Sequence, residues 1–133
     1  MAAGTTPIFI ATPKTWYGQV TVANTGRDGS GTIVTLVTGA ANGSAVQAIN
    51  LWAAATSAAN VVRIFLSLDG GTTKRLIYEF EITAVTVSGS VAGFNAEWIP
   101  SLPINLPDAN AILYASVHTT GETINLRLTG GDY

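Results

Sequence analysis

The chain contains one histidine, His118, and no cysteine, which leaves few of the side chains that usually carry acid–base, nucleophilic or metal chemistry. Catalysis through His118 would require a nucleophile or an acidic partner, and the sequence indicates neither. A zinc site usually needs three or four nitrogen or sulfur ligands. We therefore expect a structural role for His118, and we predict no catalytic residue, no metal site and no cofactor.

Two carboxylates, Glu79 and Glu81, lie two residues apart in a segment that alternates like a β-strand. Residues at this spacing project from the same face of a strand. A glycosidase instead places its two carboxylates across a sugar cleft from each other. We interpret the pair as part of a solvated outer face, where Lys74 and Arg75 balance its charge.

The glycine-rich segment 26–32 has the composition of a phosphate-binding loop. It lacks the Gly-Lys-Ser/Thr ending of such loops, and no helix follows whose N-terminus would hold an anion. The segment is thus predicted to be a turn between strands. Within it, Arg27 and Asp28 are expected to form a local ion pair or an exposed contact at a subunit boundary.

Three tryptophans and four tyrosines supply aromatic surface that would suit a carbohydrate-stacking platform. Trp52 and Trp98 share their parity with apolar neighbours, so core packing is the stronger interpretation for both. Trp16 and Tyr17 lie where the N-terminal segment meets the first predicted strand, and we expect them to anchor an interface.

Short segments of alternating polar and apolar residues, separated by turn-forming residues, dominate the chain. The clearest pair forms a hairpin in which Leu76, Tyr78, Phe80 and Ile82 share the inner face. About eight strands at this spacing predict an all-β fold, an antiparallel β-sandwich of the jelly-roll type. The expected strands are 16–23, 32–38, 45–54, 61–68, 74–83, 93–99, 111–117 and 123–129, with an extended edge connection over 101–106.

Residues 1–15 contain two prolines and disfavour a helix, so we expect an extended N-terminal arm followed by one sandwich domain over 16–133. An apolar triplet in this arm would be a liability in solvent. We expect it to dock on a neighbouring subunit or partner, the alternative being a frayed terminus. The triplet is Ile8, Phe9 and Ile10.

Charged residues make up only 11% of the 133 residues, and the net charge is −2. Such a surface is easily desolvated against another protein, which favours assembly with other copies. Six scattered basic residues offer no footprint for nucleic acid. The uncharged stretch 29–62 is interrupted by polar residues throughout, so no membrane span is expected. The N-terminus lacks the features of a secretory signal, which favours cytoplasmic synthesis.

Taken in order, several short elements resemble those of small tailed-phage virion proteins, in the head decoration or cement family. They span nearly the full chain. The matching elements are the loop and strand from Asn24 to Thr35, the turn from Gly39 to Ser44, the strand from Val62 to Phe65, the connection Asn105-Leu106-Pro107, the segment from Ala115 to His118 and the terminal Gly130-Gly131-Asp132-Tyr133.

The resemblance implies a β-sandwich or jelly-roll protein, often a homotrimer, on the exterior of a phage capsid. Such a protein would stabilise the capsid by bridging major capsid subunits. It also implies interface positions at Arg27, Asp28, Asp132 and Tyr133. A tail or baseplate component and a carbohydrate-binding β-sandwich module are the alternatives, and an enzyme is the least favoured interpretation.

Overall fold

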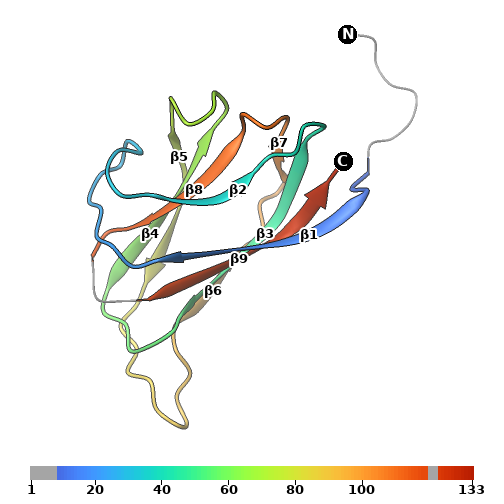
Figure 1. Ribbon diagram of the computed structural model, residues 1–133. Helices are drawn as coiled ribbons and strands as arrows, with labels where there is room; N and C mark the ends of the chain where they lie inside the picture. Colours follow the sequence, from blue (N-terminus) through green and yellow to red (C-terminus); the bar gives the residue numbers. More distant parts are fainter. Residues whose placement is uncertain (1–8, 120–122) are drawn as a thin grey trace.

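The computed structural model describes residues 9–119 and 123–133, and in these ranges it contains nine β-strands and no helix (Figure 1). This confirms the predicted all-β class. No described helix is therefore long and apolar enough to span a membrane. The strands are β1 (Thr12–Val20), β2 (Val34–Thr38), β3 (Ser44–Ala53), β4 (Asn60–Ser67), β5 (Arg75–Ile82), β6 (Asn95–Trp98), β7 (Ile104–Leu106), β8 (Ile112–Val117) and β9 (Ile124–Asp132).

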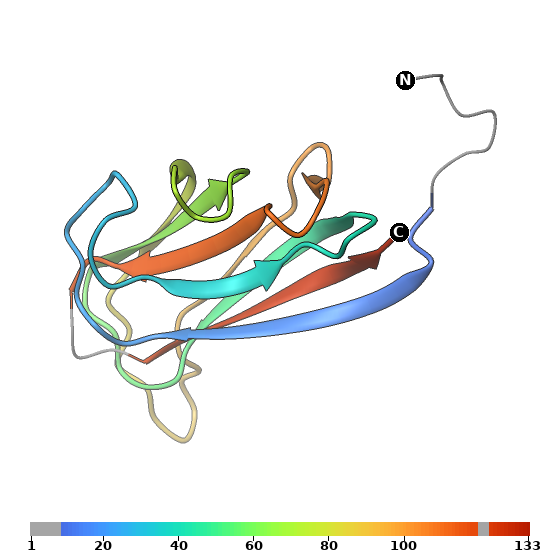
Figure 2. The ribbon, with the colours of Figure 1, turned by 45° about the horizontal axis from the view of Figure 1, so that its top comes forward.

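The strands form two antiparallel sheets that lie face to face (Figure 2). One, called here the β9 sheet, has the order β1-β9-β3-β6, with β7 also paired to β3. The other, the β8 sheet, has the order β2-β8-β4-β5. The chain crosses between the sheets so that early and late strands become neighbours, which is the arrangement of a jelly roll. The predicted fold is confirmed.

The core lies between the sheets and consists of Phe80 and many aliphatic side chains from both layers. Trp98 packs against this core and stacks on Tyr78, with ring centroids 4.1 Å apart and planes 4° apart. The predicted core position of Trp98 is thus confirmed. The largest fully buried side chains include Ile49, Leu51, Ile64, Leu113, Leu126 and Leu128.

Trp52 lies on the outer face of the β9 sheet and is 39% exposed, so its predicted core position is wrong. The reason is a shift of register between β3 and β9 at Val46 and Ala48. A bulge reverses the parity of every residue that follows it. Val46 is buried, and beyond the bulge Ile49 and Leu51 are the buried residues while Trp52 faces out.

A similar shift affects the predicted hairpin, whose two strands are β4 and β5. The register changes between Ile64 and Phe65. Tyr78, Phe80 and Ile82 contact the core as predicted, but Leu76 does not, and Ile77 takes its place.

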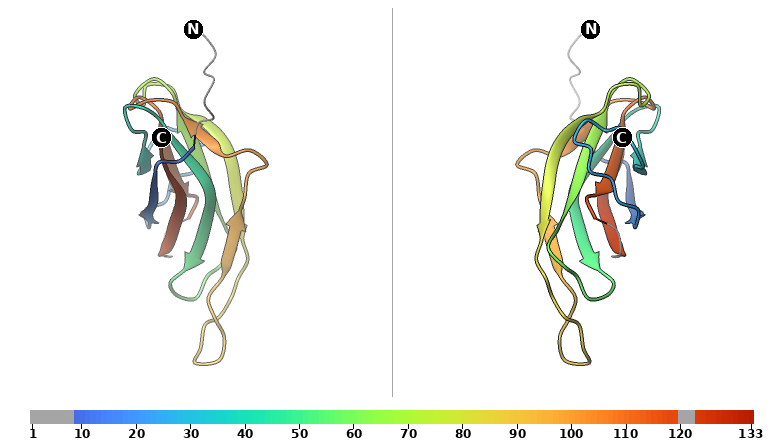
Figure 3. Two further views of the ribbon diagram at one scale, coloured as in Figure 1. Left: turned by 90° about the vertical axis from the view of Figure 1, so that its right-hand side faces the viewer. Right: turned by 90° about the vertical axis from the view of Figure 1, so that its left-hand side faces the viewer.

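β1 begins at Thr12, so the last four residues of the expected arm pair with β9. The expected edge connection over 101–106 ends in β7, which pairs with β3 and adds the ninth strand. Two segments extend from the body in the side views of Figure 3. They are the loop between β5 and β6 and the shorter loop between β6 and β7.

Candidate functional site

The glycine-rich segment forms a loop, residues 24–31, that is organised by the amide of Asn24. Its Nδ2 donates to the carbonyl oxygens of Ser30 at 2.7 Å and Thr32 at 2.8 Å, while Oδ1 accepts from the Gly26 amide at 2.9 Å. Gly31 has φ of 79°, a conformation that favours glycine. The segment is the turn between strands that its composition predicted.

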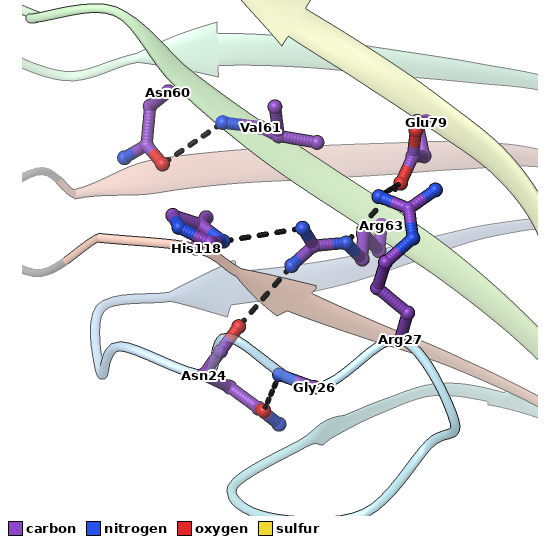
Figure 4. Close-up of polar contacts among 8 residues, drawn as sticks. All are labelled: Asn24, Gly26, Arg27, Asn60, Val61, Arg63, Glu79 and His118. Atoms are coloured by element: carbon purple, nitrogen blue, oxygen red, sulfur yellow. Dashed lines mark hydrogen bonds and ion pairs between the residues drawn. The ribbon is translucent and has the colours of Figure 1, made fainter.

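Arg63 on β4 holds this loop against the β8 sheet (Figure 4). Its side chain is only 4% exposed. Nη1 donates to the Asn24 carbonyl at 3.2 Å, Nε donates to Glu79 Oε1 at 3.2 Å, and Nη2 lies 3.1 Å from His118 Nδ1. Because a guanidinium only donates, His118 Nδ1 is the acceptor in this contact. His118 thus contributes to the contacts that hold Arg63 in place, and its lack of a catalytic role stays a prediction.

Arg27 completes the cluster from the loop itself, with Nη1 2.5 Å from Glu79 Oε1. The expected pair between Arg27 and Asp28 is therefore wrong. Asp28 Oδ1 instead accepts from the backbone N and the hydroxyl of Ser30, because the turn brings those donors next to it. Asp28 and Arg27 both remain exposed, and their predicted role at a subunit boundary stays a prediction.

Glu79 is also placed differently from the expected solvated face. It is half-buried between two arginines that come from distant parts of the chain. Hydrogen bonding to Arg27 is the main cause that lowers the pKa of the Glu79 carboxyl below its usual range, and Arg63 adds to it. Lys74, expected to balance it, donates to the Gly71 carbonyl instead.

A groove of about 440 Å³ lies beside this cluster, between β4, β5 and the end of β8. Two carboxylates line it: Glu79 is already paired with two cations, and Glu81 is exposed on the same face of β5. Across residues 9–119 and 123–133, no three His, Cys, Asp or Glu side chains gather as they would around a metal ion. The contacts of Arg63 with the Asn24 carbonyl and of Glu79 with Arg27 hold the loop 24–31 against the β8 sheet. The groove is lined by Ala59, Asn60, Val61, Glu79, Glu81, Ile82 and His118.

The N-terminal arm and the C-terminus meet at one end of the β9 sheet. Ile8 lies outside the described residues, Phe9 is exposed, and Ile10 lies against Gly131. The Ala11 amide donates to the Asp132 carbonyl at 2.9 Å.

Asp132 and Tyr133, both predicted interface residues, make contacts within the chain at this same end. Asp132 pairs with Lys14 at 2.5 Å and accepts from the Ser44 hydroxyl at 2.6 Å. The hydrogen bond from Lys14 is the main cause that lowers the pKa of Asp132. The Tyr133 amide donates to the Gly43 carbonyl at 3.1 Å. Their interface roles stay predictions.

The neighbouring residues Trp16 and Tyr17 point to opposite sides of β1. Trp16 is half-buried and packs against the core, whereas Tyr17 is 77% exposed on the outer face. Only Tyr17 therefore offers most of its ring to a partner, and the predicted anchoring role of both residues remains a prediction.

The most prominent apolar feature missed by the sequence analysis is the loop between β6 and β7. β6 pairs with residues 49–52 of β3 and β7 pairs with residues 44–46, so residues 99–103 are looped out from the sheet edge. Ile99 is 66% exposed and Leu102 is 80% exposed. The prolines at 100 and 103, with apolar residues beside them, were the available signal.

Phe9 and this loop lie at opposite edges of the β9 sheet. Phe9 precedes β1, which is one edge strand, while Ile99 and Leu102 follow β6, which is the other. The two edges are separated by β9 and β3. The sheet therefore has exposed apolar side chains next to both of its edge strands.

No family model and no curated protein matches this chain. Among solved structures, it is similar to a chain of the cyanophage Pam1 capsid asymmetric unit, with 18% identity, a TM-score of 0.47, and coverage of 100% of this chain and 93% of that one. It is also similar to a chain of the T13 particle of infectious bursal disease virus, with 13% identity, a TM-score of 0.36, and coverage of 97% and 35%.

A chain of the Gx strain of infectious bursal disease virus gives 15% identity, a TM-score of 0.33, and coverage of 97% of this chain and 36% of that one. This chain thus spans little more than a third of the two bursal disease virus chains. At these low scores, a functional assignment has to rest on the fold and the exposed side chains.

Proposed function

We propose that this protein is a structural component of a tailed-phage virion that sits on the capsid exterior and stabilises it by bridging neighbouring major capsid subunits. The observation that carries this proposal is the presence of exposed apolar side chains at the two opposite edges of one sheet in a jelly roll. The jelly roll itself is a fold used by viral capsid and lectin domains.

The β6–β7 loop is suited to docking because it is short and conformationally restricted. Pro100 and Pro103 limit the backbone of the segment that carries Ile99 and Leu102, and paired strands fix both of its ends. Little entropy is then lost when the loop is immobilised against a partner. Burial of the two side chains would stabilise the complex by removing apolar surface from water.

Contact points at two edges support a bridge between two neighbouring subunits rather than a single attachment. Each contact is small, so one alone would bind weakly, whereas simultaneous contacts raise the overall avidity without further surface. In a homotrimer, three copies of the arm and loop would face the shell. We include this trimer in the proposal, with synthesis in the host cytoplasm before assembly.

A binding experiment with particles tests the proposal. Heads purified from the parent phage without this protein are mixed with the wild-type chain and sedimented. The wild type should sediment with the heads, and Ile99→Ser combined with Leu102→Ser should weaken binding at least tenfold. Leu68→Ser is the matched control, because Leu68 is also exposed but follows β4 in the other sheet.

The same experiment separates the rival assignments. Binding to tails and not to heads would replace the proposal with a tail or baseplate role. If the chain stays in the supernatant when it is mixed with heads or with tails, and is a monomer in light scattering, a virion role is contradicted altogether.

A further inference from the structure

The outer face of the β9 sheet carries two rows of aromatic and planar polar side chains that run across the strands. Each row takes one residue from β1, β9, β3 and β6. Residues directly opposite each other on neighbouring strands lie close enough for their side chains to interact. The first row is Tyr17, Arg127, Asn50 and Glu97, and the second is Gln19, Asn125, Trp52 and Asn95.

Asn50 holds the centre of the first row in place and is only 8% exposed. Its Nδ2 donates to Glu97 Oε2 at 2.5 Å, and its Oδ1 accepts from Arg127 Nη2 at 3.2 Å. A buried amide that is bonded on both sides fixes its partners. Glu97 and Arg127 are thus held in position on the outer face of the β9 sheet.

Arg127 extends this arrangement to the second row by lying over the Trp52 ring, with Cζ 5.2 Å from the ring centroid. Beside it, Gln19 Nε2 donates to Asn125 Oδ1 at 2.8 Å. The rings and amides border a hollow of about 360 Å³. Its lining consists of Tyr17, Trp52, Asn125, Leu126 and Arg127.

We propose that this hollow binds a carbohydrate, as a function separate from attachment to a particle. Tyr17 offers an exposed ring face for the apolar C–H side of a pyranose, and Trp52 offers the part of its ring that Arg127 leaves uncovered. Arg127 and Asn125 present planar groups suited to paired hydrogen bonds with adjacent hydroxyls. A small number of fixed polar groups around apolar rings is the usual composition of a small-ligand site.

The spacing of the rings favours a short oligosaccharide over a single sugar. Tyr17 is on β1 and Trp52 is on β3, and these strands are separated by β9. Two strand spacings across the sheet and a two-residue offset along the strands separate the two backbone positions by about 12 Å, a span longer than one pyranose unit. Arg127 projects from β9, which lies between these two strands, and would contact the linkage region.

Other classes of ligand fit this face less well. A standard protein interface covers about 800 Å² per partner and its core is depleted of charge, whereas this face has two aromatic rings among amides and charged groups. A single-stranded nucleic acid needs a basic groove beside its stacking rings, and here Glu97 offsets the charge of Arg127.

Two experiments test the proposal. A glycan array first screens the full chain for ligands. Backbone amide spectra of the full chain are then recorded during titration with cellotetraose, maltotetraose and N-acetylchitotetraose. At least one probe should bind saturably and shift amides of β1, β9 and β3 around the two rows. Trp52→Ala and Tyr17→Ala should each weaken binding at least tenfold, and Arg127→Lys should weaken it despite the retained charge. Phe9→Ala is the control, because Phe9 is an exposed aromatic residue that precedes β1 and does not line the hollow.

Absence of binding to every array glycan and to the three probes would overturn the proposal. So would equal affinity in Trp52→Ala with an unchanged circular dichroism spectrum, or shifts confined to the β6–β7 loop. The outcome is independent of particle attachment, because Trp52→Ala should still sediment with heads.

Discussion

Arg63 and Glu79 lie directly opposite each other on β4 and β5, with Nε of the arginine 3.2 Å from Oε1 of the carboxylate. The same oxygen pairs with Arg27, which comes from the loop over the sheet. One half-buried carboxylate therefore connects the hairpin, a buried cation and the loop 24–31. Removal of its charge should affect all three.

Glu79→Gln should lower the free energy of unfolding by about 1–2 kcal/mol, because the buried Arg63 guanidinium loses its counter-ion while the shape of the side chain is kept. Glu81→Gln is the matched control on the same face, and it should change stability by less than about 0.5 kcal/mol. Urea denaturation measures both. Equal losses in the two variants would show that Glu79 has no special role.

Stability should also fall in acid, since the pKa of Glu79 is lowered by Arg27 and that of Asp132 by Lys14. A carboxyl with a lowered pKa in the folded state binds protons more readily when unfolded. The stability that such a carboxyl contributes is complete at a pH above its ordinary pKa, which is 4.5 for Glu79 and 3.8 for Asp132. This stability is lost as the pH falls through the lowered pKa of the folded state.

Denaturation curves recorded between pH 7 and pH 3 check this dependence. The wild type should lose stability as the pH falls below about 4.5, and Glu79→Gln should show a shallower decline. Parallel curves for the two proteins would rule out Glu79 as a source of the acid sensitivity.

Asn24→Asp should loosen the loop 24–31 without unfolding the sandwich. The substitution keeps an acceptor for the Gly26 amide but removes the Nδ2 donor that binds the Ser30 and Thr32 carbonyls. Amide hydrogen exchange should become faster in the loop, while β8 and β4 stay protected. Unchanged exchange in the loop would contradict the organising role of Asn24.

Gly130→Ala should be strongly destabilising, because an added Cβ would lie 1.9 Å from the Ala45 carbonyl oxygen. Both residues belong to paired strands in the middle of the β9 sheet, so the backbone has little room to shift. A loss of about 2–3 kcal/mol is expected in thermal or urea denaturation.

Gly89→Ala is the control for this prediction. An added Cβ at Gly89 meets no described atom within 4 Å, and the residue lies in the exposed loop between β5 and β6. Its stability should stay within about 0.5 kcal/mol of the wild type. Similar losses at the two glycines would show that close packing at Gly130 is not the cause.

The local pattern of the sequence predicted the strands and the class of fold well. Alternation over 74–83 and β-branched residues over 32–38 reflect which side of a strand is buried, and this is a local property. The side that Trp52 faces was predicted wrongly, because the bulge at Val46 and Ala48 depends on how β3 pairs with β9, over seventy residues away.

The candidate site was harder to predict because its contacts connect distant parts of the chain. Arg63 meets Asn24, Glu79 and His118, and Arg27 meets Glu79 in place of the adjacent Asp28. The sequence indicated the loop and its charged residues. The pairing between strands decided which charges meet.

The position of the protein on an intact particle tests the central claim most directly. A reconstruction of the parent phage by electron cryomicroscopy should show the jelly roll on the outside of the head, with Ile99 and Leu102 buried against one capsid subunit and the N-terminal arm against a neighbour. Density for the chain only in the tail, or on the head with the β6–β7 loop facing solvent, would contradict the account.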